Sequence, residues 1–175
     1  CYEVNNRNQV CNAGLAIAAL AVWEKAPILC RDVLESSIAR NRLAMESLYA
    51  PDGIYDEGAV YWSYGTTFEI ALLDALESIL GTDYGLSEVP GFDRTPYFEI
   101  NMFSSTGREQ DFFNYADTED SLTLPGCIWY FVRRSGDCGF LWPVREIYEQ
   151  PSLLCDKYCD DRLAFITLYE AVHAQ

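Results

Sequence analysis

A helical periodicity that runs through almost the whole chain restricts its fold more than any other feature. Residues 8–25, "NQVCNAGLAIAALAVWEK", are mostly apolar and small, which predicts a helix buried on most of its sides. Residues 26–49 predict an amphipathic outer helix, with an apolar stripe at Cys30, Leu34, Ile38, Met45 and Leu48. The sequence therefore predicts antiparallel hairpins in which buried and outer helices alternate.

The remaining residues continue this pattern after a Pro-Asp-Gly turn at 51–53. A helix stopped by Gly81 is expected next, and residues 82–120 predict an irregular connection around a single helix, because they are rich in Gly, Pro, Ser and Asp. The expected helices lie at 66–81, near 90–103, and at 124–136, 140–150 and 159–174. Because no segment alternates as a strand does, the fold class is all-α. Stacked helical hairpins of this kind build a solenoid or an α/α toroid.

Charge and hydropathy exclude two classes of partner. The 175 residues include 27 acidic and 12 basic ones, so the net charge is −15. Such a surface repels phosphate backbones, and no nucleic-acid partner is expected. The longest apolar run, near residues 13–23, is shorter than the roughly 18 residues that a membrane-spanning helix needs, so no span is expected.

The seven cysteines and the first residues bear on how the chain is organised. An odd number of cysteines without framework spacing favours buried thiols, with some disulfide as the alternative. Cys155 and Cys159 are one helical turn apart but lack a second Cys/His pair, so no metal site is predicted. The opening "CYEVNNRNQV" has neither an initiator Met nor a signal-peptide pattern, which predicts a piece of a longer protein.

Four phrases together resemble the helical region of heparinase II/III-like proteins, a polysaccharide-lyase superfamily. They are "NNRNQVCNAGLAIAALAV", "YAPDGIYDEGAVYWSYGTT", "LGTDYGLSEVPGF" and "DFFNYAD", and the resemblance extends from Asn5 to about Trp142. It implies an incomplete α/α toroid in which residues 1–175 are one helical domain. It also implies a C-terminal β-sandwich missing from this chain, and a periplasmic or secreted bacterial protein.

The resemblance also implies an activity, the cleavage of a polysaccharide that contains uronic acid by β-elimination. In that reaction a preorganised group neutralises the uronate carboxylate, a base removes the C5 proton and an acid protonates the leaving oxygen. By position, Tyr61 matches the acid/base tyrosine, and Asn6 with Arg7 matches the neutralising group. Arg7 departs from the pattern, because many active lyases have His there. Further sugar contacts are expected from Asn5, Trp62, Tyr64 and Glu57, and no cofactor is implied.

Each of these residues also has an ordinary structural interpretation. Tyr61 suits packing where a loop enters a helix, and Asn5 and Asn6 suit capping of the helix that follows them. Arg7 suits a surface cation, and Glu57 suits a turn or cap. Two other functions therefore stay open. One is a carbohydrate-binding module that breaks no bond, and the other is a glycoside hydrolase, which needs a pair of carboxylates at controlled separation.

Overall fold

The computed structural model describes residues 3–102, 113, 115–116 and 127–142. These residues form helices and no strand, which confirms the all-α class. The α-helices are α1 (Asn6–Ala21), α2 (Pro27–Leu48), α3 (Ala59–Leu80), α4 (Thr95–Met102) and α5 (Ile128–Ser135). Three short 3-10 helices accompany them, η1 (Trp23–Lys25), η2 (Phe92–Arg94) and η3 (Cys138–Leu141).

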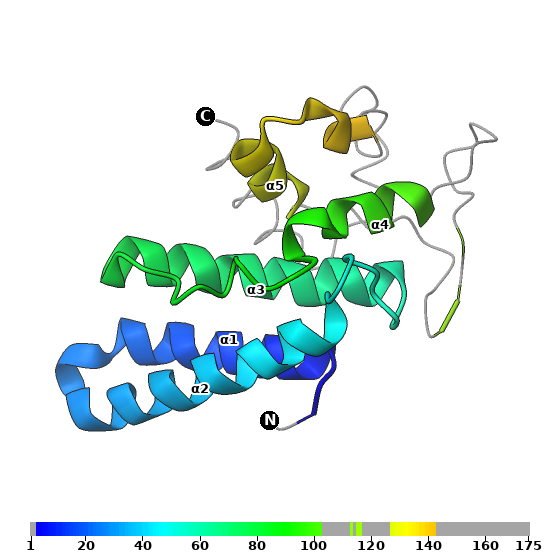
Figure 1. The fold of residues 1–175 in the computed structure, drawn as a ribbon. Coiled ribbons are helices and arrows are strands. Elements are labelled where there is room, and N and C mark those ends of the chain that lie inside the picture. Colours follow the sequence, from blue (N-terminus) through cyan, green and yellow to red (C-terminus); the bar gives the residue numbers. More distant parts are fainter. Residues whose placement is uncertain (1–2, 103–112, 114, 117–126, 143–175) are drawn as a thin grey trace, which may run out of the picture.

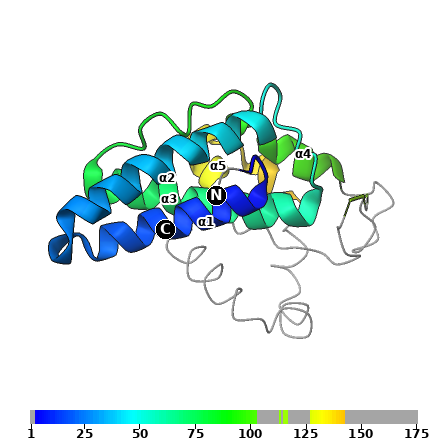
Figure 2. The ribbon, with the colours of Figure 1, turned by 90° about the horizontal axis from the view of Figure 1, so that it is seen from below.

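Three long helices make up one side of the molecule. α1 and α2 form an antiparallel hairpin, and α1 also packs along α3, as Figures 1 and 2 show. α4 and α5 lie on the far side of α3 from α1 in Figure 1, so α3 is the central element. α4 contacts both α3 and η3, which links α5 and η3 to the long helices.

Local sequence explains where the long helices begin and end. The Asn5 side chain caps α1 by accepting from the backbone N–H of Asn8 at 3.3 Å. Pro27 occupies the first turn of α2, where its missing N–H costs nothing. α3 ends at Gly81, whose left-handed backbone is the usual helix stop.

The apolar stripes agree with the sequence patterns, with two exceptions. Cys30, Leu34, Met45 and Leu48 are buried on α2, and Leu72 and Leu76 are buried on α3. Ile79 is 59% exposed, however, so the α3 stripe ends before the last turn. The prediction that the first helix is buried on most sides agrees with the cover that α2 and α3 give to α1, but it did not foresee a fully open face. α1 leaves one face open to solvent, formed by Cys11, Gly14, Leu15 and Ala18.

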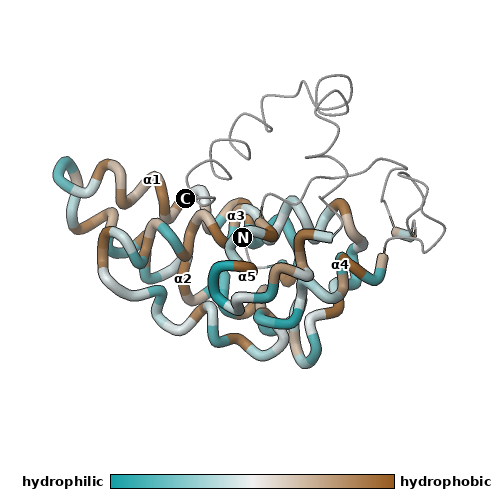
Figure 3. Tube along the Cα trace, turned by 90° about the horizontal axis from the view of Figure 1, so that it is seen from above, coloured by the Kyte–Doolittle hydropathy of each residue, from teal (hydrophilic) through white to brown (hydrophobic). Residues whose placement is uncertain are grey.

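The hydropathy of the chain fits this arrangement. Figure 3 shows hydrophilic and hydrophobic positions alternating along α2, as expected of a helix with one covered and one open face. α1 does not follow this rule, because its open face is apolar and Asn8, Gln9 and Asn12 are buried. None of the helices in the described residues is long and apolar enough to cross a membrane.

The Pro-Asp-Gly turn between α2 and α3 packs backbone to backbone against the segment before α4. Gly53 and Gly91 both have positive φ, 91° and 86°. A Cβ on Gly53 would lie 2.7 Å from the carbonyl oxygen of Gly91, and a Cβ on Gly91 would overlap the carbonyl of Tyr49. Only glycine permits both the conformation and the approach. This contact fixes α4 relative to the α2–α3 connection.

Helix α3 begins earlier than the sequence predicts, at Ala59 and not near Thr66. Tyr61, Trp62 and Tyr64 therefore belong to a helix, where they face different directions. The helix expected near 90–103 is present as η2 followed by α4. Of the helix expected at 140–150 only the first residues are described, within η3, and the one expected at 159–174 lies outside the described residues.

Candidate functional site

The first turn of α1 lies against the beginning of α3, which brings three predicted residues together. The backbone N–H of Asn6 donates to Glu57 Oε2 at 2.7 Å, across 51 positions of sequence. The Cβ of Asn6 lies 3.2 Å from the place that a Cβ on Gly65 would take. Tyr61 is midway between Glu57 and Gly65 in sequence, and one helical turn before Gly65 on α3. Asn6 therefore sits next to the helix face that carries Tyr61.

The Glu57 carboxyl is held by the N-terminus of α1. Partial burial raises its pKa above 4.5, and the charge of Asp56 acts in the same direction. The N–H of Asn6 and, more weakly, the charge of Arg7 lower the pKa and offset part of this shift. Arg7 thus belongs electrostatically to the same group, although its side chain is exposed and pairs with Glu3 at 3.5 Å.

The polar ends of Asn6 and Tyr61 have no hydrogen-bond partner among the described residues. Asn6 is 9% exposed, and only its backbone N–H has a partner, Glu57. Tyr61 is half-buried, with its ring packed against the core. An amide and a phenol hydroxyl are both donors and acceptors, so both groups are available to a ligand at this surface.

Tyr64 and Asn5 border this group. The Tyr64 ring is 36% exposed and packs edge-on against Phe68, with 5.3 Å between ring centroids. One face of the ring is thus supported and the other side is accessible. Asn5 acts as the α1 cap, and its Nδ2 also donates to Glu3 at 3.3 Å. The capping interpretation of Asn5 is confirmed, and its contact with a sugar stays a prediction.

Trp62 faces the core. Its ring is fully buried, and its Nε1–H donates to Thr95 Oγ1 at 2.7 Å. The prediction that this ring stacks on a sugar is wrong for this structure, because neither face is accessible. Its role is to join α3 to the beginning of α4.

Asn6, Arg7, Glu57 and Tyr61 are called the surface group below. Beneath it lies a buried polar network that the sequence did not reveal. Tyr55 donates to Gln9 Oε1 at 2.8 Å, and Gln9 Nε2 donates to Tyr49 Oη at 2.8 Å. Tyr49 is also 2.9 Å from Thr66 Oγ1, and Gln9 Nε2 reaches Glu69 at 3.4 Å. Two of the four tyrosines around the Pro-Asp-Gly turn are therefore structural, since they hydrogen-bond deep between α1 and α3.

Glu69 is the carboxyl end of this network. It is fully buried, and burial raises its pKa from 4.5 to about 8, an effect that the amides of Asn41 and Gln9 only partly offset. Its Oε1 has no hydrogen-bond partner among the described residues. Glu69 is therefore held between three helices in its protonated form at neutral pH.

A second buried carboxyl, Glu99, lies on α4. It is 2% exposed, its Oε2 has no partner among the described residues, and burial raises its pKa well above the ordinary value. Burial raises the pKa of the Tyr115 hydroxyl, and the charges of Asp56 and Glu99 act in the same direction, so Tyr115 lies near both of these acids. Neither Glu69 nor Glu99 has a sequence signature, because a glutamate in a helix ordinarily faces solvent.

The chain matches no family model and no curated protein.

The described residues contain no group of three His, Cys, Asp or Glu side chains that could hold a metal ion. None of their four cysteines forms a disulfide with another described cysteine, and Cys30 and Cys127 are buried whereas Cys11 and Cys138 are exposed. The surface group itself presents amide, guanidinium, phenol and carboxyl side chains. These are the group types that acid–base work on a sugar uses.

Proposed function

We propose that this chain is the helical part of a heparinase II/III-like lyase that cleaves a uronate-containing polysaccharide by β-elimination. In this proposal the helices belong to an incomplete α/α toroid, followed in the parent protein by a β-sandwich. The parent acts in the periplasm or outside a bacterial cell, and its partner is the polysaccharide.

One observation carries the proposal. Asn6 and Glu57, far apart in sequence, meet through the 2.7 Å hydrogen bond, and Asn6 also packs beside Gly65, one turn after Tyr61. Asn6, which the resemblance assigns to carboxylate neutralisation, therefore lies beside Glu57 and Gly65, the positions one turn before and one turn after Tyr61. This convergence is not a consequence of the helical periodicity.

The proposed roles follow from the chemistry of each group. The Asn6 amide and the Arg7 guanidinium bind the uronate carboxylate, and Arg7 is able to do so in a bidentate manner. The N-terminus of α1 adds its partial positive charge. Tyr61 acts as base and acid in turn: its deprotonated phenol removes the C5 proton, and the same proton is then delivered to the leaving glycosidic oxygen. Arg7 has no role as a base, because a guanidinium stays protonated in proteins.

The net charge of −15 opposes an anionic substrate, so a local cation is required. Arg7 supplies it at the proposed site, since its side chain is 71% exposed and its pairing with Glu3 is exposed as well. A surface pair of this kind is weak, so a substrate carboxylate competes with Glu3 at little cost.

The test is a product assay on the protein expressed at the full length of its gene. It is incubated with alginate, heparan sulfate, hyaluronan and polygalacturonate, and the ultraviolet absorbance of unsaturated uronate is followed together with new reducing ends. Both signals rising on at least one polymer is the expected result. Reducing ends without absorbance would establish a hydrolase instead, and binding with neither signal a carbohydrate-binding module.

Two tyrosine variants locate the acid. Tyr61→Phe removes only the hydroxyl, and we expect a loss of roughly 100-fold or more in kcat/KM, the usual contribution of a general acid. Tyr64→Phe is the matched control one turn away, and it is expected to keep most of the activity. Equal activities of the two variants would assign the acid role elsewhere.

A further inference from the structure

The open face of α1 is apolar and, among the described residues, uncovered. Two large side chains on it, Leu15 and Val22, are 51% and 50% exposed, and the Trp23 ring at its end is 39% exposed. Residues 8–22 include no charged side chain, although the chain carries a net charge of −15. An exposed apolar face of this kind marks a surface on which another element packs.

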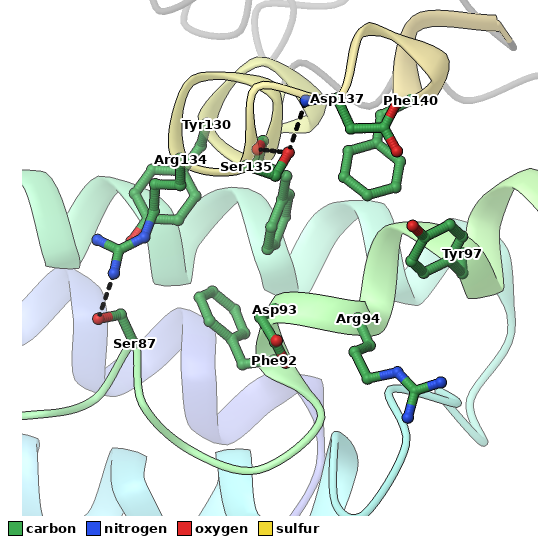
Figure 4. A pocket seen from close by; sticks show the side chains of 11 residues that line it. Ser87, Phe92, Asp93, Arg94, Tyr97, Tyr130, Arg134, Ser135, Asp137 and Phe140 are labelled. Carbon is green, nitrogen blue, oxygen red and sulfur yellow. Dashed lines mark hydrogen bonds between the residues drawn. The ribbon is translucent and has the colours of Figure 1, made fainter.

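On the other side of α3, the aromatic residues are already covered. α4, α5 and η3 lie there, around a pocket of about 490 Å³ that Tyr130 lines. Figure 4 shows Phe92 from η2 and Phe140 from η3 at this pocket, and they are 1% and 2% exposed. Tyr97 packs edge-on against Phe140, with 5.0 Å between the ring centroids. The covering layer on this side of α3 thus contrasts with the open side of α1.

The chain itself contains a segment that fits the open face. Residues 159–174 lie outside the described residues, and their sequence predicts a helix of 16 residues, the same length as α1. The large apolar residues of this segment recur at i, i+3, i+4 and i+7, which places them on one side of a helix. This apolar stripe is formed by Phe165, Leu168, Tyr169 and Val172. Large side chains of this kind pack into the space that Gly14 and Ala18 leave beside Leu15.

The chain is long enough for the segment to reach this face. Trp142, which follows η3, is the last described residue, so residues 143–158 connect it to the segment. Sixteen extended residues span roughly 50 Å. The distance to be crossed is about two helix widths, α3 and α1, or roughly 20–24 Å.

Charge favours a tethered occupant over a second copy of the chain. Two chains that each carry a net charge of −15 repel each other. A segment on the same chain meets the face at a high effective concentration instead. We infer that residues 159–174 pack as a helix on the open face of α1, with the apolar stripe toward Leu15 and Ala18. The inference does not rest on the proposed lyase activity, since it involves no residue of the surface group.

Cys11 lies on the open face and reports whether that face is covered. The protein expressed at the full length of its gene is treated with iodoacetamide, and the labelling of each cysteine is followed by mass spectrometry of its peptides. Cys138, exposed on η3, is the internal reference. Cys11 is expected to react at least about tenfold more slowly than Cys138, because it is accessible only while the segment is detached.

Three variants of the segment test what covers Cys11. Phe165→Asp and Leu168→Asp should each raise its labelling rate about tenfold, because a carboxylate is costly to bury in an apolar contact. Thr167→Asp is the matched control, since it adds the same charge on the opposite side of the predicted helix and should leave the rate unchanged. The midpoint of thermal unfolding shows that each variant is folded at the temperature of labelling.

Leu168→Cys gives a second test that introduces no charge. A short bismaleimide is expected to join Cys11 to position 168 within one molecule, and mass spectrometry identifies the linked peptides. The yield should not change when the protein is diluted, because the two groups belong to the same chain.

Three outcomes would overturn the inference. Cys11 labelling as fast as that of Cys138 would mean that the face is open. Protection that Phe165→Asp and Leu168→Asp leave intact would assign the face to another part of the protein. Protection that is lost on dilution, with a doubled mass by light scattering before dilution, would assign it to a second copy. None of these measurements needs a substrate, so this inference and the proposed lyase activity can fail independently.

Discussion

Asn6 combines a structural contact with the ligand-binding role proposed for it. Its backbone N–H holds Glu57, while its side-chain amide keeps no partner among the described residues. The N–H groups at the start of a helix are ordinarily satisfied by a cap or by water. Here a carboxyl from the next hairpin takes one of them. The position of α1 relative to α3 is therefore set by the residues proposed to meet the substrate.

At the scale of the residue, we predict that the Asn6–Glu57 contact positions the substrate. Glu57→Gln keeps the side-chain shape but weakens the hydrogen bond, because a neutral acceptor is roughly half as strong as a charged one. KM on the polysaccharide should rise several-fold, with a smaller change in kcat. Kinetics across a range of substrate concentrations measure this split. Glu46→Gln, an exposed substitution on α2, is the control. A fall in kcat with KM unchanged would contradict the positioning role.

Gly65 and Gly14 give a second prediction from matched helical glycines. A Cβ on Gly65 would lie 2.5 Å from Gln9 Oε1 and 2.6 Å from the Tyr55 hydroxyl, two groups that are buried and bonded to each other. Gly65→Ala should therefore lower the free energy of unfolding by about 1–3 kcal/mol. Urea unfolding measures the change.

Gly14→Ala is the control, because nothing lies within 4 Å of its added Cβ. Alanine is the better helix former, so this variant should be as stable as the parent or more stable, by up to about 1 kcal/mol. Equal effects of the two substitutions would mean that the Gln9–Tyr55 pair moves away without cost.

At the scale of the elements, a single hydroxyl connects three segments. Thr95 begins α4, and its Oγ1 accepts from Trp62 Nε1 of α3 at 2.7 Å and donates to the Gly53 carbonyl of the turn at 2.8 Å. Both bonds are buried. Trp62 is therefore buried because it connects α3 to α4, and its ring offers no accessible aromatic surface.

We predict that Thr95→Val destabilises the protein by roughly 2 kcal/mol or more, because an indole N–H and a carbonyl lose their partner together. Thr67→Val is the control, since its hydroxyl bonds only to the Ser63 carbonyl one turn earlier in the same helix. The midpoints of thermal unfolding of the two variants are compared to test this prediction. Similar midpoints would show that solvent replaces Thr95 without penalty.

At the scale of the whole molecule, folding stability is predicted to fall as pH rises. The folded state raises the pKa of Glu69 from 4.5 to about 8, so unfolding releases its proton between these values. The contribution of this group is fully present below about pH 4.5 and is lost as pH rises toward about 8, at up to about 1.4 kcal/mol per pH unit. Above that pH the loss levels off.

Glu69→Gln removes this titration. Relative to the parent, the variant should gain stability by up to about 4 kcal/mol between about pH 5 and pH 8. Urea unfolding at both pH values gives the difference, and Glu35→Gln, an exposed carboxyl on α2, is the control. Parallel pH profiles of parent and Glu69→Gln would contradict a protonated Glu69 in the folded state.

Sequence periodicity predicted that the described residues are helical. It did not predict which side of each helix is covered. The stripe of α2 was predicted because large apolar residues recur along one face. Small residues gave no such signal in α1, so the sequence did not predict which face is open, and Leu15 on that face is 51% exposed. The sequence predicted the start of α3 too late, near Thr66 and not at Ala59. It therefore did not determine in which directions Trp62 and Tyr64 face.

The contacts that build the surface group were beyond any local pattern. The Asn6–Glu57 bond joins residues 51 positions apart, and only the resemblance suggested that they meet. The pocket near Tyr130 had no sequence signal at all, because its two sides come from separate segments whose aromatic residues read as ordinary core.

The contact between Gly53 and Gly91 bears on how such a protein can diversify. Both glycines lie where loops meet backbone to backbone, so neither tolerates a side chain, and no neighbouring substitution can make room for one. Residues such as Asp52 and Glu88, exposed on the same loops, are not constrained in this way. We therefore expect proteins that share this fold to differ in the side chains around the Gly53–Gly91 contact. Substitutions or insertions at the contact itself are expected to be selected against.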